Sequence, residues 1–350
     1  MKVNQQLIAD RLKLSRTTVS RCFTNHPKIN PETRAAVFQL AAELGYEYRA
    51  PRNVAARKPD GRNTIAVLIG VPESRRDAVN TAKIILKGIF EKAAAMGLNV
   101  AVHYVDAGQY RLAPRARRIL PGVSSSDWKG VVLLYPFEEQ TVGNLSAKFP
   151  VISVLDDYDT VDVDCINPDE IRGITRMVQR LYDLGHRRIG FMSWKYTVHA
   201  PWVERRFGSY VENLYRLGLE FDPRLAVNMR REENMEPAEM AVEVARLTRE
   251  AGVTAWVCAA DHQAYQLMRD LAKLGIRVPK DCSVTGFDGI KPPRGMPQLT
   301  TVRTPFHDIG VSCLVSLQRR MDHPSASRRH ILVDCREVPG KTTRAVKARV

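Results

Sequence analysis

Several residue patterns that would indicate an enzyme are missing from this sequence. The six cysteines are scattered and form no Cys-x-x-Cys pair, so we expect reduced, mostly buried thiols and no disulfide framework. No Gly-x-Ser-x-Gly elbow, Walker A loop, Gly-x-Gly-x-x-Gly fingerprint or metal-spaced His and Cys cluster occurs. We therefore expect no catalytic residue, no bound metal and no cofactor.

Long apolar segments are also absent. No apolar run is long enough to span a bilayer, and no apolar signal-peptide region follows Met1. These observations favour a cytoplasmic protein without a membrane partner.

The charge of the chain is high and unevenly distributed. Of the 350 residues 44% are hydrophobic, which is enough for a sizeable core in two or three domains. The net charge of +15 predicts a polyanionic partner, either nucleic acid or an anionic membrane surface. Residues 1–62 hold 12 Lys and Arg against 5 Asp and Glu, almost half of the excess. We therefore expect a small basic module attached to a nearly ordinary body.

The first 46 residues have the apolar spacing of three short helices. Ser15 is a suitable N-cap for a second helix that begins at Arg16, and Asn30 caps a third that begins with Pro31. The residues that would share one core are Leu7, Ile8, Ala9, Leu12, Val19, Cys22, Phe23, Val37, Leu40, Ala41 and Leu44. Two short helices joined by a tight turn, the second with a polar and basic outer face, predict a helix-turn-helix.

The exposed face of the second helix has the chemistry for reading double-stranded DNA. Arg16 and Arg21 can each present a planar fork of donors to guanine, and Thr17 can bind a base edge or contact a thymine methyl. Thr18 and Ser20 suit phosphate oxygens better. An isolated pair of arginines would be a solvated surface, but the turn, the cap and the third helix favour DNA binding.

This segment resembles the DNA-binding domain of the lactose-repressor (LacI/GalR) family. The matching residues are Ala9, the Leu14-Ser15 turn, the run Thr18-Val19-Ser20-Arg21, the run Ile29-Asn30-Pro31-Glu32-Thr33-Arg34 and the closing Leu44-Gly45-Tyr46. The resemblance implies that Arg16, Thr17 and Arg21 read bases, and we include Asn30 among the DNA-binding residues. It also implies a homodimer on a near-palindromic operator, and it favours a repressor over an activator.

Residues 49–63 are basic and contain Pro51, Pro59 and Gly61, which predicts a linker with at most one short helix. Family members usually place a hinge helix here, with a leucine that wedges into the minor groove. This chain has no leucine in the segment, so the sequence leaves open whether a hinge helix forms. Arg52 and Arg57 are our candidates for phosphate or minor-groove contacts, with a flexible spacer as the alternative.

Strands and helices alternate through the body, which predicts an α/β fold of parallel sheets with helices on both faces. The segments 184–190, 277–290, 298–305 and 335–343 resemble the two-lobed periplasmic-binding-protein-like domain of the same family. The resemblance gives a helix-turn-helix head over 1–48, a linker over 49–63, an effector and dimerisation body over 64–340 and a basic tail over 341–350. Its lobes would be 64–161 with 292–320, and 162–291 with 321–340.

The resemblance also implies a small-molecule effector held between the two lobes. Arg205 lies where the family has an effector-binding arginine, and Asp156 and Asp288 end strands in positions of acidic ligand acceptors. Trp202 is our candidate for stacking on a sugar face. An arginine with two carboxylates suits a polyol such as a sugar. Without the family match, a surface arginine, turn-forming aspartates and a core tryptophan would be the simpler interpretation.

Two other classes of function, an enzyme and a sugar-binding protein, fit the sequence less well. An α/β enzyme would need motifs that the sequence does not have, and a soluble sugar-binding protein would need no DNA-reading module. The sequence leaves open which effector binds, whether dimers or tetramers form, and which operator is read.

Overall fold

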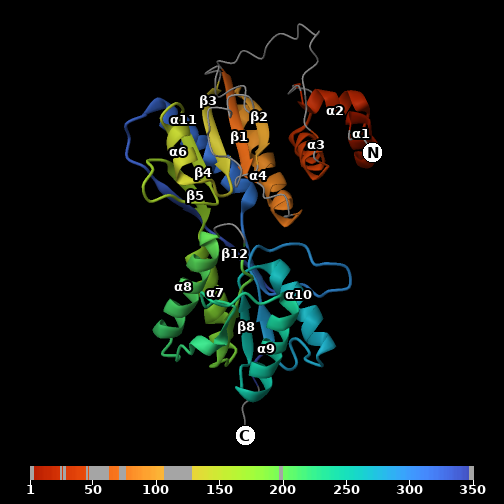
Figure 1. The fold of residues 1–350 in the computed structure, drawn as a ribbon, viewed down its shortest axis with the longest axis vertical. Helices are drawn as coiled ribbons and strands as arrows, with labels where there is room; N and C mark the ends of the chain where they lie inside the picture. Colours follow the sequence, from red (N-terminus) through yellow and green to blue (C-terminus); the bar gives the residue numbers. More distant parts are fainter. Residues whose placement is uncertain are drawn as a thin grey trace. The chain divides into compact units, whose positions relative to one another are not determined.

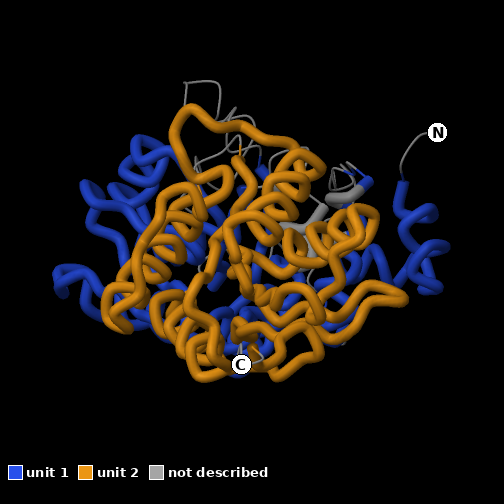
Figure 2. The backbone as a smooth tube through the Cα atoms, turned by 90° about the horizontal axis from the view of Figure 1, so that it is seen from below, with its two compact units in different colours: residues 1–167, 306–333 blue, residues 168–305, 334–350 orange. Residues whose placement is uncertain are grey.

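The computed structural model describes residues 4–23, 26, 29–44, 46, 63–70, 76–105, 128–196 and 200–346. The chain forms two compact units (Figure 2). Unit 1 contains Met1–Asn167 and Phe306–Val333, and unit 2 contains Pro168–Pro305 and Asp334–Val350.

The head consists of α1 (Gln5–Leu12), α2 (Arg16–Phe23) and α3 (Pro31–Glu43), drawn in red at the start of the chain (Figure 1). Two caps fix where the last two helices begin. Ser15 Oγ accepts the Thr18 N–H at 3.0 Å, and Asn30 Oδ1 accepts the Thr33 N–H at 2.7 Å. The fully or nearly buried core residues are Ile8, Ala9, Val19, Cys22, Val37, Leu40 and Ala41. The three predicted helices, their caps and their shared core are confirmed, except that Leu7 is only half-buried and is not among the residues of this core.

Unit 1 is built on a six-stranded sheet with the order β11-β5-β4-β3-β1-β2. The strands are β1 (Thr64–Gly70), β2 (Asn99–Val105), β3 (Trp128–Leu134), β4 (Val151–Val154), β5 (Asp164–Pro168) and β11 (His330–Val333). The neighbours from β2 to β5 pair in parallel. Among the described residues, the helices of this unit beyond the head are α4 (Arg76–Ala95), α6 (Glu139–Ser146) and α11 (Phe306–Asp322).

Alternate residues of these strands enter two separate cores. Ile65, Val67 and Ile69 of β1 pack in the core that contains α4 and α11 residues. Ala66 and Leu68 pack in the core that contains α6 residues. Because successive strand side chains point to opposite faces, helices cover both faces of this sheet.

Unit 2 contains a four-stranded parallel sheet with the order β7-β6-β8-β9. Its strands are β6 (Ile189–Met192), β7 (Ala226–Val227), β8 (Ala255–Cys258) and β9 (Ser283–Thr285). The covering helices are α7 (Glu170–Asp183), α8 (Pro201–Arg216), α9 (Pro237–Glu250) and α10 (Asp261–Lys273). Residues of α9 and α10 pack with Trp256, and residues of α7 and α8 pack with Phe191, so helices again lie on both faces.

The predicted fold class is therefore confirmed, with differences in detail. The strands β10 (Thr301–Arg303) and β12 (Arg336–Val338) form an antiparallel pair that the expectation of parallel sheets did not include. The position of Asp261 at the start of a helical segment predicts an N-cap, and this prediction is wrong: Ala260 takes the N-cap position of α10, and the Asp261 carboxylate accepts from Thr301 and Ile290 instead. No helix among the described residues is long and apolar enough to cross a membrane.

Candidate functional site

The polar face of α2 is the first candidate site. Val19 and Cys22 are fully buried, whereas Arg16, Thr17 and Arg21 are exposed. The burial follows the helical period, so one face of α2 holds the head together and the other is left for a partner. Arg21 lies five positions after Arg16 and one turn after Thr17, and together the three side chains present two guanidinium groups and a hydroxyl.

Two other predicted DNA contacts, Thr18 and Asn30, have structural roles within the head. Thr18 and Ser20 are only partly exposed, and Thr18 Oγ1 lies 2.9 Å from Ser15 Oγ at the start of α2. Asn30 is exposed, but its side chain already caps α3. Each of these residues stays a prediction as a DNA contact.

Arg34 is a buried residue of the head that sequence reasoning did not single out. Its Nη2 donates to the carbonyl oxygen of His26 at 2.7 Å and more weakly to that of Ile29 at 3.4 Å, which holds the chain before α3. The position of Arg34 in the matching run Ile29–Arg34 was the sequence feature that could have identified this residue. Arg52 and Arg57 lie outside the described residues.

Unit 2 contains a cluster of charged side chains, which we call the arginine–carboxylate cluster: Glu170, Arg205, Arg206, Asp261 and Asp288. Arg205 Nε donates to Glu170 Oε2 at 2.5 Å, and Arg206 Nη2 lies 3.2 Å from Glu170 Oε1. Glu170 begins α7, and both arginines lie in α8. One carboxylate therefore joins these two helices through two guanidinium groups.

Arg206 connects this cluster to the ends of two strands. Its Nη1 donates to the carbonyl oxygen of Ala259 at 2.6 Å, just after β8, and its Nη2 donates to Asp288 Oδ1 at 3.3 Å. The guanidinium carbon lies 3.8 Å from the ring centroid of Phe287 and 4.6 Å from that of Trp202. A cation between two aromatic faces with three oxygen partners is held in one position.

The two aspartates of the cluster are perturbed by their surroundings. Burial raises the pKa of Asp288 to about 7, with Arg206 opposing the rise, and burial raises the pKa of Asp261 to about 6. Asp288 has a positive φ of 118°, a backbone conformation that side-chain-bearing residues rarely adopt. Strain of this kind is often found at binding sites.

Aromatic side chains gather close to the cluster. Trp202 and Tyr196 have ring centroids 5.3 Å apart, and Trp194 and His262 have ring centroids 4.9 Å apart. Gln263, which is fully buried, donates to Tyr196 Oη at 2.6 Å. All four rings are partly exposed, so they offer faces on which a sugar or another ring can stack.

The fourth predicted effector residue, Asp156, belongs to unit 1. It follows β4, its side chain is buried, and Ser153 Oγ donates to its carbonyl oxygen at 3.0 Å. Burial and the nearby Asp156 carboxylate raise the pKa of the Tyr158 phenol.

The structure thus brings three of the four predicted effector residues together, in unit 2. Arg205 and Asp288 join the same cluster, and Trp202 lies against Arg206. Sequence reasoning missed Glu170 and Arg206. Arg206 lies four residues after Trp202, a spacing that places both on one face of a helix, and this was the available signal.

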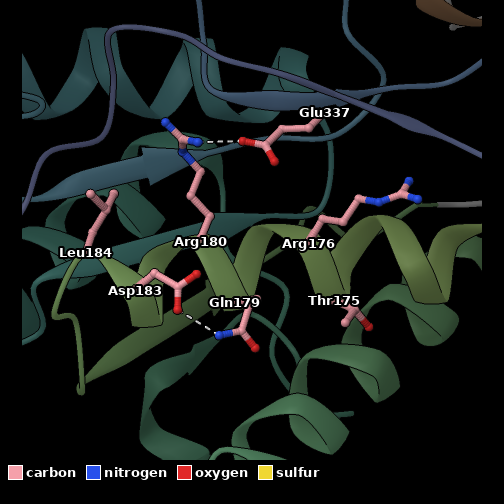
Figure 3. A pocket seen from close by; sticks show the side chains of 7 residues that line it. All are labelled: Thr175, Arg176, Gln179, Arg180, Asp183, Leu184 and Glu337. Carbon is pink, nitrogen blue, oxygen red and sulfur yellow. Dashed lines mark hydrogen bonds and ion pairs between the residues drawn. The ribbon is translucent and has the colours of Figure 1, made fainter.

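A separate surface hollow borders α7 and is lined by Thr175, Arg176, Gln179, Arg180, Asp183, Leu184 and Glu337 (Figure 3). Figure 3 shows Arg180 and Glu337 pointing toward one another, and Arg180 Nη1 donates to Glu337 at 2.6 Å. Arg176 Nη2 pairs with Asp334 at 3.0 Å. Because its arginines are bound to carboxylates of the same chain, and no predicted residue lines it, we assign this hollow no ligand.

Two family models match the chain. Residues 6–48 match the model of bacterial regulatory proteins of the lacI family, and residues 178–343 match that of the periplasmic binding protein-like domain. The HTH-type transcriptional repressor CytR of Escherichia coli (strain K12) is 25% identical over 348 residues, which cover 97% of this chain and 96% of the relative.

Solved structures with the same fold include the complex of the transcriptional regulator CelR with cellobiose. It superposes with a TM-score of 0.65 at 22% identity and covers 97% of this chain and 100% of that one. The lac repressor dimer bound to operator and the anti-inducer ONPF superposes with a TM-score of 0.63 at 22% identity, over 99% and 100% of the two chains. The solved structures show the shared fold, and the matched models with the relative aligned over nearly the whole chain support one conclusion: the chain carries the DNA-binding domain of the lacI family of bacterial regulatory proteins in front of a periplasmic-binding-protein-like domain, and is a DNA-binding regulator of transcription.

Proposed function

We propose that this protein is a cytoplasmic repressor that binds a near-palindromic operator as a homodimer and releases or tightens its hold when a sugar or sugar derivative binds. The head over 1–48 would read the DNA, the linker over 49–63 would join it to the body, and the body over 64–340 would bind the effector and pair the chains. It would need no metal or other cofactor and would catalyse no reaction.

The observation that carries this proposal is the two-sided burial of α2. Its apolar side chains are used in the core of the head, and Arg16, Thr17 and Arg21 are left exposed on a helix of a size that a major groove accepts. Thr18, Ser20, Asn30, Arg52 and Arg57 would bind the phosphate backbone around them.

For the effector, the proposal rests on Arg205, Asp288 and Trp202. They combine donors, an acceptor and an apolar ring, which is the set that a polyhydroxylated ring requires. Asp156 is proposed as a further acceptor. Cellobiose in the CelR complex supports a sugar as the effector class.

The test is an anisotropy titration of the full-length protein on labelled DNA from upstream of its own gene, compared with scrambled DNA at several salt concentrations. We expect specific binding that weakens steeply as salt rises. Arg21→Ala should weaken operator binding by about 1–3 kcal/mol, roughly 5- to 150-fold, with little change on scrambled DNA.

Arg11→Ala is the matched control, because Arg11 is exposed in the head but lies on α1. It removes the same charge without removing a group from the α2 face. If both substitutions weakened specific and nonspecific binding equally, the head would be an electrostatic patch and the proposed reading surface would be wrong.

A further inference from the structure

The arginine–carboxylate cluster has two layers that differ in exposure. The side chains of Arg205 and Asp288 are 25% and 19% exposed, whereas those of Glu170 and Arg206 are 2% and 5% exposed. A ligand that approaches unit 2 at this point can contact the first pair directly. The second pair lies beneath it and acts through the first.

Glu170 determines the charge that the exposed layer offers to a ligand. Its two oxygens bind both guanidinium groups, one at 2.5 Å and the other at 3.2 Å. Arg206 is further bound to Asp288 at 3.3 Å. Both guanidinium groups are therefore bound by carboxylates of the cluster, and neither arginine is left with an uncompensated positive charge.

We infer that Glu170 is a specificity-determining residue that excludes carboxylate- and phosphate-bearing effectors and restricts the site to uncharged or cationic polyols. The inference rests on the proposed effector site. An anion would have to compete with Glu170 for Arg205, and it would also be repelled by a buried carboxylate that water screens weakly. A neutral hydroxyl group meets neither obstacle, since it can accept from Arg205 and donate to Asp288 together.

The burial of Glu170 makes this selectivity an electrostatic property of the site. A carboxylate that is 2% exposed is costly to desolvate unless cations and hydrogen bonds compensate it. Here two arginines provide that compensation, so the negative charge is retained at short range. Its replacement by an uncharged isostere leaves the cluster one positive charge richer at almost unchanged volume.

The experiment is isothermal titration calorimetry on the full chain with hexoses in three charge forms: the neutral sugar, its uronate and its amino sugar, for example glucose, glucuronate and glucosamine, with galactose and mannose series alongside. The wild-type protein should bind the uronate of its preferred series at least about tenfold more weakly than the neutral sugar. Glu170→Gln should reduce or reverse that ratio by at least about tenfold.

Glu204→Gln is the matched control, because Glu204 is an exposed glutamate of α8, one position before Arg205, and lies outside the cluster. It should keep the wild-type ratio. A change in the ratio of uronate to neutral affinity is a readout that a purely structural role of Glu170 would not produce. Operator affinity, measured in parallel, reports whether the variant is folded.

The outcomes separate the two proposals. Equal uronate-to-neutral ratios in the wild type, Glu170→Gln and Glu204→Gln would overturn the role of Glu170 and leave the proposed sugar effector standing. A wild-type protein that binds the uronate as tightly as the neutral sugar would overturn it even if Glu170→Gln did not fold. Absence of saturable binding for every neutral sugar would overturn the proposed effector class, and this inference with it.

Discussion

Arg206 offers the most demanding test of how unit 2 is held together. In Arg206→Met the side chain keeps its apolar stem but loses the guanidinium group, and with it the charge, the donors and the stacking on Phe287 and Trp202. The lost partners are the carbonyl oxygen of Ala259 at 2.6 Å, Glu170 at 3.2 Å and Asp288 at 3.3 Å.

The size of the effect follows from the burial of those partners. Removal of one member of a buried ion pair typically costs 3–5 kcal/mol, because the partner is left charged and desolvated. Glu170 retains Arg205, but Asp288 loses the guanidinium group that accompanies it. Methionine retains the apolar stem of the arginine and none of its hydrogen bonds, so we expect Arg206→Met to lower the free energy of unfolding by about 3–5 kcal/mol.

Urea denaturation followed by tryptophan fluorescence measures this loss, since Trp194, Trp202 and Trp256 all lie in unit 2. Arg216→Met is the matched control on the same helix. Arg216 is 63% exposed and pairs only with the exposed Glu212 among the contacts described, so its loss should cost about 0.3–0.5 kcal/mol. If the two variants lost the same stability, the cluster would not be what fixes α8 to the sheet.

The same variant makes a prediction about pH. Burial raises the pKa of Asp288 to about 7 in the wild type, and Arg206 opposes the rise. Without Arg206 the pKa of Asp288 should rise further, so the folded variant binds a proton that the unfolded chain releases. Its stability deficit should therefore grow as pH increases from 6 to 8 and shrink as pH falls.

Two further predictions concern stability and reactivity. The six cysteines are buried, and burial raises the pKa of each thiol. Ellman's reagent at pH 8 should therefore react rapidly with none of them in the native protein and with all of them in denaturant. Fast labelling of a thiol in the native protein would contradict the described core. Hydrogen bonds from Arg224 lower the pKa of Asp222 to about 2, so its stabilising contribution should be complete above pH 4 and be lost as pH falls toward 2. The stability difference between wild type and Asp222→Asn should accordingly be smaller at pH 3 than at pH 7, and a constant difference would count against this ion pair.

The sequence predicted the parts of this fold that depend on local patterns. The head has apolar residues at helical spacing and two cap residues, and each feature acts within a few positions of the chain. The alternation of strands and helices in the body is likewise predictable, because the spacing of apolar residues differs between a strand and a helix. Asp261 shows where such reasoning stops: its position before a helix predicts a cap, but its carboxylate binds Thr301, which is 40 residues away. A cap and a long-range acceptor look the same in sequence.

The residues of the candidate site also divide into those that the sequence marks and those that depend on distant contacts. Arg205 and Asp288 were found because the resemblance marks their positions, and Trp202 because it neighbours Arg205. Glu170 was missed because its partners lie 35 and 36 residues further on, in another helix. Arg206 was missed because an arginine next to a marked arginine looks like a solvated neighbour, and its burial depends on how α8 meets the sheet.

The two layers of the cluster explain why the missed residues matter as much as those that were found. An exposed arginine on a helix has many accessible rotamers, and ordering it for a ligand costs rotamer entropy. Arg205 is bound to Glu170, which also binds Arg206, and Arg206 is bound to the end of β8 and to Asp288. The groups that a ligand would contact are thus ordered before it arrives by residues that it does not contact. Recognition and stability therefore depend on one network in unit 2, and a change in its buried layer should alter both.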